Sequence, residues 1–258
     1  MYQKANREQS EPMAITNSKP QLANLDPLAQ LTAGRLPERI SRLVIGLWLY
    51  GLSIALMIEG AVGAAPWDVF HVGVARHLPL TLGVIIILTA GVVLAAWIPL
   101  RQKPGLGTVL NTVLLGPFAD LNLVLLPTPD AVVARYGYAI AGVVVCALAT
   151  ALYVGAQLGP GPRDGLMTGL ARRTGWPLRR VRTGIEVSVL ATGFVLGGTV
   201  GLGTVVFAFA VGPLTQFFLR YLTVPVVAAA EATGAPPARC PARSPASHRA
   251  PPPRRRRR

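Results

Sequence analysis

Two short segments of this 258-residue chain have the residue types and spacing for chemistry at the start of a helix. Pro66 precedes Asp68, and 96 positions later Pro162 precedes Asp164. Proline suits the first turn of a helix, because its missing N–H would have no partner there. A carboxylate close behind it favours the helix dipole. Two such helix starts that met inside a membrane would offer backbone N–H groups to an anion and carboxylates to a cation or a proton.

A simpler interpretation is that each aspartate only stabilises its own helix start. Arg76 and Arg172 follow the aspartates by about two helical turns, so neither can bond to its own aspartate. We expect these two arginines either to pair across the two segments or to mark the level of the lipid headgroups.

Asp120 and Glu186 lie within long apolar segments, where acidic side chains are costly and are therefore functional candidates. Glu186 has a structural alternative, because Arg182 lies four residues before it and can pair with it on a helix. The predicted pathway for a substrate or an ion comprises both acids and the two Pro-x-Asp segments with their arginines: Pro66, Asp68, Arg76, Pro162, Asp164, Arg172, Asp120 and Glu186.

The composition indicates a membrane protein, because 52% of the residues are apolar and only 14% are charged, against about 25% charged in soluble proteins. A helix needs about 20 mainly apolar residues to cross a bilayer. Apolar runs of that size predict six spans, at about 43–62, 80–100, 106–126, 138–157 and 181–198, with the last ending near residue 222. The elements that begin at Pro66 and Pro162 are too short to cross. The expected fold is an all-α integral membrane protein with six transmembrane helices and two short half-helices.

The chain is internally duplicated. Residues 43–126 align without a gap with residues 139–222, giving 24 identities in 84 positions. Each copy holds three predicted spans, an odd number, so the copies would face opposite ways as inverted repeats, an arrangement common in transporters. The alternative is a duplication that serves packing alone.

The segments outside the two copies are predicted to be a polar N-terminal tail at 1–42, an outer linker at 127–138 and a Pro/Arg-rich tail at 223–258. The composition of both tails favours disorder. With six spans, 23 of the 25 lysines and arginines fall on one side, so both termini are predicted to be cytoplasmic. An eight-span topology would give almost the same division of lysines and arginines between the two sides. The element that begins at Pro66 is too short to cross the membrane, and we therefore predict six spans.

The formal net charge of +14 does not indicate a nucleic-acid partner, because the arginines flank apolar runs and fill the tails, as suits anionic lipid headgroups. The chain has no phosphate-binding loop and no His-Glu pair at zinc spacing. We therefore expect no enzyme activity, no metal and no cofactor. The expected partners are the lipid bilayer and an unknown small solute, and a homo-oligomer is left open.

Both copies contain Gly-x-x-Pro-x-Asp, followed later by Gly-x-Gly-Thr and Gly-Pro. Over about residues 43–222 this pattern resembles the bacterial YczE/YyaS/YitT-type integral membrane proteins. The resemblance implies a bacterial plasma-membrane protein with a duplicated unit and no established activity. Some relatives end in a folded cytosolic domain, and this chain has only its Pro/Arg tail, so a sensing role of such a domain is not implied.

The sequence thus supports two hypotheses of different classes. One is a small-solute transporter or permease with a site at the interface of the repeats. The alternative is a non-transporting membrane scaffold or accessory subunit. A transporter would have a polar, acid-lined cavity near the middle of the membrane, whereas a scaffold would have tightly packed helices and an apolar groove.

Overall fold

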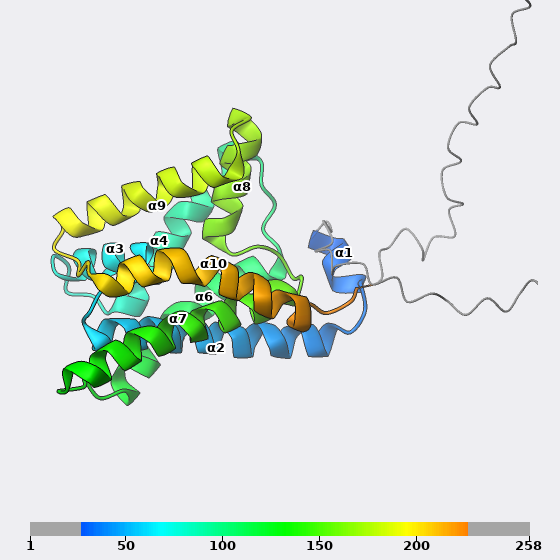
Figure 1. Cartoon of the computed structure of the whole chain (residues 1–258). Coiled ribbons are helices and arrows are strands. Elements are labelled where there is room, and N and C mark those ends of the chain that lie inside the picture. Colours follow the sequence, from blue (N-terminus) through cyan, green and yellow to red (C-terminus); the bar gives the residue numbers. More distant parts are fainter. Residues whose placement is uncertain (1–26, 227–258) are drawn as a thin grey trace, which may run out of the picture.

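The computed structural model describes residues 27–226, and all regular secondary structure among these residues is helical (Figure 1). The predicted tail residues 1–26 and 227–258 lie outside the described residues. Helical structure begins before residue 43, the predicted start of the first span. The helices are α1 (Pro27–Thr32), α2 (Leu36–Gly60), α3 (Pro66–Ala75), α4 (Leu82–Ala95), α5 (Trp97–Leu100), α6 (Leu106–Leu125), α7 (Val132–Gly155), α8 (Pro162–Thr174), α9 (Leu178–Val195) and α10 (Leu202–Leu222).

Among the described residues, five helical segments are long and apolar enough to cross a membrane. They are α2, α4 with α5, α6, α7 and α10. The fifth predicted span, at about 181–198, corresponds to α9, which is not among them because its 18 residues include three arginines and Glu186. The fold is therefore that of an all-helical membrane protein with five clearly apolar helices and one helix of mixed character.

The two ends of the described chain meet at one end of the bundle. The Arg42 guanidinium, near the start of α2, donates to the Leu222 carbonyl at the end of α10, at 2.9 Å. The backbone N–H of Val224 donates to the Gly155 carbonyl, also at 2.9 Å. The start of α2 and the end of α10 consequently lie on the same side of the molecule (Figure 1).

Helices α2 and α7 lie side by side and form the most extensive contact between two helices among the described residues, with another long helix packed on each member of this central pair (Figure 1). Small residues allow the close approach: a Cβ added to Gly46 would lie 2.9 Å from the backbone nitrogen of Tyr153. Helix α6 packs on α2, and α10 packs on α7. Each central helix is thus covered by the last long helix of its own half of the sequence.

The loop before each short helix is held by the other half of the chain. The Gly107 N–H, at the start of α6, donates to the Leu158 carbonyl at 2.7 Å, and the Gly203 N–H, at the start of α10, donates to the Val62 carbonyl at 2.9 Å. These loops turn at Gly63 and Gly159, whose φ angles are +117° and +116°, a region that favours glycine. The short helices also reach the other half, since α3 packs mainly on α9, and α8 packs on α4 and α5 as well as on α9 of its own half.

The two halves differ in one contact. Helix α4 packs closely on α6, where the Gly83 N–H donates to the Asp120 carboxylate at 2.7 Å and a Cβ on Gly83 would lie 2.3 Å from the Gly116 carbonyl oxygen. At the corresponding positions of the second half, Arg179 is exposed, and a Cβ on Gly212 would meet no atom within 4 Å. Helix α9 therefore does not make the contact with α10 that α4 makes with α6.

Candidate functional site

The two short helices meet at their N-terminal turns. Helices α3 and α8 begin at Pro66 and Pro162, as the sequence predicts, and both prolines are buried. The residue after each proline makes the contact: the Arg163 guanidinium carbon lies 4.8 Å from the centroid of the Trp67 ring. A cation over a tryptophan ring is attracted by the ring's negative face, so this pair joins the two halves of the chain.

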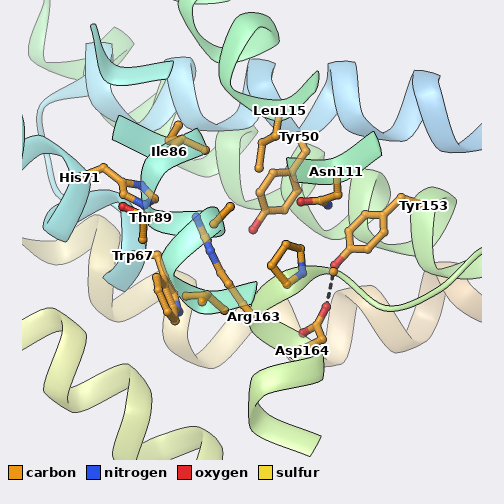
Figure 2. A pocket seen from close by; sticks show the side chains of 14 residues that line it. Tyr50, Trp67, His71, Ile86, Thr89, Asn111, Leu115, Tyr153, Arg163 and Asp164 are labelled. Atoms are coloured by element: carbon orange, nitrogen blue, oxygen red, sulfur yellow. Dashed lines mark hydrogen bonds between the residues drawn. The ribbon is translucent and has the colours of Figure 1, made fainter. Parts of the chain in front are cut away.

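A partly open cavity of about 60 Å³ lies beside this contact (Figure 2). Helices α2, α3, α4, α6, α7 and α8 line it. Its volume suits a few water molecules or a small solute, since one water needs roughly 10–15 Å³ on this measure. Ile86, Val93 and Leu115 supply apolar wall. The polar side chains that face it include Tyr50, His71, Thr89, Asn111, Arg163 and Asp164.

The cavity contains two opposite charges that are not paired with each other. Oδ2 of Asp164 accepts a hydrogen bond from the Tyr153 hydroxyl at 2.8 Å (Figure 2). Arg163 is half-buried, and within residues 27–226 its guanidinium has no ion pair and no hydrogen-bond acceptor; its interaction is with Trp67. Charged groups inside a helical bundle are costly unless they are paired, so Arg163 is positioned to receive an anionic group.

Unpartnered polar atoms gather on the α3 side of the cavity. His71 is fully buried, and its Nδ1 lies 3.5 Å from Oδ1 of Asp68, too far for a normal hydrogen bond. Both ring nitrogens of His71, Oδ1 of Asp68 and Nε1 of Trp67 are buried without a hydrogen-bond partner in the described part of the chain. Burial lowers the pKa of His71 below its ordinary value, which favours the neutral ring at pH 7. Since buried polar groups in proteins are nearly always bonded, these atoms indicate a place for a polar ligand or for water.

The predicted pathway residues divide into three groups. Pro162 and Asp164 line the cavity, and Pro66 and Asp68 lie in the first turn of α3, which contributes Trp67 and His71 to the wall. Asp120 lies at the contact between α4 and α6.

The remaining three predicted residues lie away from the cavity. Glu186 pairs with Arg182 at 2.9 Å on α9, which is the structural alternative that the sequence offered. Arg172 donates to the Gln102 side chain at 2.7 Å, and the Arg76 side chain lies beside Gly197. Neither arginine pairs with an aspartate among the described residues.

Several cavity residues were not predicted: Tyr50, Trp67, His71, Asn111, Tyr153 and Arg163. Their shared signal is that they differ between the two copies. Trp67 corresponds to Arg163, His71 to Met167 and Tyr153 to Met57. A search for identical positions finds the loops that hold the two halves together, whereas the cavity wall lies largely at positions that have diverged.

The described residues contain no group of three or more histidines, cysteines or acids placed to hold a metal ion. The polar side chains of the cavity can recognise a solute by charge and by hydrogen bonding. Arg163 can bind an anionic group, Asp164 can bind a cationic group, and Tyr50 and Asn111 can supply further hydrogen bonds.

Comparison with known proteins places the chain among relatives that are themselves described as uncharacterized. Residues 37–220 match the family described as "Family of unknown function (DUF6198)". The chain belongs to the DUF6198 family. An uncharacterized protein of Haemophilus influenzae is 37% identical over 185 residues, which cover 72% of this chain and 85% of that protein. The resemblance to the YczE-type proteins is thereby confirmed at the level of the family.

Two Bacillus subtilis proteins extend the comparison. The uncharacterized membrane protein YczE is 36% identical over 67% of this chain and 82% of its own length. The uncharacterized protein YyaS is 26% identical over 68% of this chain and 89% of its own length. No solved structure matches the chain significantly. The name of the YczE relative agrees with the apolar helices of the fold in indicating a membrane protein.

Proposed function

We propose that this protein is a carrier for a small solute in the bacterial plasma membrane, with its binding site in the cavity between α3 and α8. The observation that supports this is the presence of two opposite charges, Arg163 and Asp164, in one cavity inside an apolar bundle, neither of which forms an ion pair within residues 27–226. A scaffold or accessory subunit needs only packed helices. Charged side chains without ion-pair partners would lower its stability and serve no binding function. An enzyme would need a nucleophile and a base in contact, and we propose no catalytic role.

The proposed topology has six membrane crossings in two inverted repeats, with both termini in the cytoplasm. It is supported by the contact between Arg42 and Leu222, because an odd number of crossings would separate the two ends of the bundle by the thickness of the membrane. Helix α9 supplies the one crossing that is not among the five clearly apolar helices. The ion pair between Arg182 and Glu186 reduces the free-energy cost of placing these charges in the membrane. The lysine and arginine bias supports the orientation.

The unequal packing of the two halves supports alternating access. Helix α4 is closed onto α6 through Gly83 and Asp120, whereas Arg179 and Gly212 leave the corresponding side of α9 and α10 without that contact. A carrier built from repeats exposes its site to one side at a time by exchanging such arrangements. The same unequal packing is not required of a static scaffold.

The proposal can be tested without knowing the solute. Thr89 lines the cavity, so Thr89→Cys is introduced into a background in which Cys146 and Cys240 are replaced by alanine and serine. Membrane-impermeant maleimide is applied to right-side-out and to inside-out vesicles. A carrier exposes the cavity to each side in turn, so the cysteine should label from both sides. Labelling from one side alone, or from neither, contradicts the carrier. Val124→Cys, at an exposed position outside the cavity, reports the labelling that membrane-facing sites give.

A further inference from the structure

We propose that the cavity binds a small zwitterion of the amino carboxylate class, with the carboxylate on Arg163 and the ammonium group on Asp164. This inference rests on the proposed function as a solute carrier and names the class of its substrate.

Arg163 has the geometry to receive a carboxylate. Its guanidinium is a planar fork that matches the two oxygens of a carboxylate. The Trp67 ring lies 4.8 Å from the guanidinium carbon, and an aromatic ring takes up none of the N–H donors in an ordinary hydrogen bond. In the described part of the chain no acidic side chain forms an ion pair with it. An anionic group in the cavity would therefore meet a cation that is already held in place and that the protein does not neutralise.

Asp164 makes a simple anion a poor fit. It follows Arg163 directly in α8 and faces the same cavity (Figure 2). The Tyr153 hydroxyl binds Oδ2, while Oδ1 has no hydrogen-bond partner among the described residues. A free anion bound to Arg163 would be repelled by this carboxylate, and a simple cation bound to Asp164 would be repelled by the guanidinium. A solute with both charges satisfies both side chains at once.

The remaining wall suits a compact solute with a small apolar part. Ile86, Val93 and Leu115 form an apolar surface, and Asn111 together with the Tyr50 hydroxyl offers further hydrogen bonds. The volume of about 60 Å³ holds roughly four to six waters, which matches an amino carboxylate with a short side chain. A doubly charged phosphate or sulfate would meet one guanidinium and one opposing carboxylate, and is excluded by the same charge argument.

The test uses matched probes on the purified full-length chain in detergent. Alanine has both charges, propionate lacks the amine, and ethylamine lacks the carboxylate. Binding is measured by calorimetry and by the shift in unfolding temperature at pH 7 and constant ionic strength, since a ligand of the folded state raises its stability. Alanine should bind at least tenfold more tightly than either partial probe. Glycine, serine and valine, measured in the same way, cover neighbouring sizes.

Two variants and a control link the binding to the proposed contacts. Arg163→Gln and Asp164→Asn should each lower the alanine affinity at least tenfold, while Arg172→Gln, outside the cavity, leaves it within twofold. Tyr153→Phe keeps the ring and removes the hydroxyl that holds Asp164, so it provides a second, milder variant if Asp164→Asn fails to fold. Its affinity for alanine should fall while the protein still elutes as a single species.

Three results would overturn the inference. Propionate binding as tightly as alanine would make the cavity an anion site, and ethylamine binding as tightly would make it a cation site. No binding of any of the four amino carboxylates would also reject the class. The Thr89→Cys labelling test separates these outcomes from the proposed function: labelling from both sides, together with any of the three results, leaves a carrier of a different substrate, whereas one-sided labelling rejects the carrier itself.

Discussion

The Arg163 guanidinium lies over the Trp67 ring, with 4.8 Å between its central carbon and the ring centroid, and these two residues occupy the same position in the two copies of the repeat. Each is the second residue of a short helix that begins with proline. The duplication has thus placed two equivalent backbone positions against each other, and their side chains have diverged into a cation and an aromatic partner. An identical pair of arginines here would repel, and an identical pair of tryptophans would leave the cavity without its positive charge.

Removing the Trp67 ring should weaken binding by releasing Arg163. A cation over an aromatic face contributes about 0.5–2 kcal/mol, so Trp67→Leu should reduce the affinity for alanine by roughly two- to thirtyfold. Trp176→Leu is a matched control, because Trp176 is 63% exposed and lies outside the cavity. Calorimetry on both variants checks the prediction, and equal affinities for the two would contradict it.

The two prolines are followed by aspartates whose roles should differ. Asp164 lines the cavity, whereas Asp68 lies in α3 beside His71. A charge-assisted hydrogen bond contributes about 1.5–3 kcal/mol, so Asp164→Asn should lower the alanine affinity by at least tenfold, while Asp68→Asn should change it less than threefold. Both variants should express and elute like the parent, because asparagine still stabilises a helix start. Undiminished binding in both would favour the simpler interpretation, in which each aspartate serves only its own helix.

The glycines before the short helices should be intolerant of a side chain. Gly159 has a φ of +116°, and a Cβ on it would lie 3.0 Å from the Gly105 Cα. Gly159→Ala should therefore destabilise the protein by about 1–3 kcal/mol, the usual cost of a residue held in such a backbone region. Gly91→Ala is the matched control in α4, where a Cβ would meet no atom within 4 Å and alanine favours the helix. Unfolding temperatures in one detergent test the pair, and equal shifts would refute the explanation.

The acids outside the cavity should affect stability and leave binding unchanged. Asp120 accepts the Gly83 N–H at 2.7 Å, so Asp120→Leu would leave that donor unpaired at a cost of about 1–3 kcal/mol. Glu186 pairs with Arg182 on α9, the helix proposed as a membrane crossing, where an arginine without its acid is costly. Glu186→Gln should accordingly lower the unfolding temperature. A loss of alanine binding in either variant would contradict this expectation and would indicate that the replaced acid belongs to the substrate pathway.

Single cysteines in two loops test the topology. Lys103→Cys and Ala131→Cys lie in the loops on either side of α6, so in the cysteine-free background they should label from opposite sides, Lys103→Cys from the cytoplasm. The eight-crossing alternative exchanges these sides, and cytoplasmic labelling at Ala131→Cys would therefore defeat the six-crossing arrangement. Reporter fusions at residue 10 and after Leu222 should both read as cytoplasmic.

The sequence by itself determined the parts of the fold that depend on local chemistry. Long apolar runs can satisfy their backbone in a bilayer only as helices, and the five apolar helices follow from them. The prolines set where α3 and α8 begin. Helix α9 is the instructive exception, because Arg179, Arg180, Arg182 and Glu186 give it a mixed character that hydropathy alone does not resolve.

Tertiary structure decided which residues form the cavity. Identity between the copies directs attention to Gly63 and Gly159, which are retained because the loop of one half packs on a helix start of the other. Identity between the copies does not single out Trp67 and Arg163, because these equivalent positions carry different residue types. Their contact exists only because the two short helices meet. The physical reason is that a side chain's partners across a bundle depend on helix orientation and on the approach of remote segments. Neither is encoded in the spacing of one segment. Only the assembled bundle shows that, among the described residues, Arg163 has no acceptor and the neighbouring Asp164 has one oxygen without a donor.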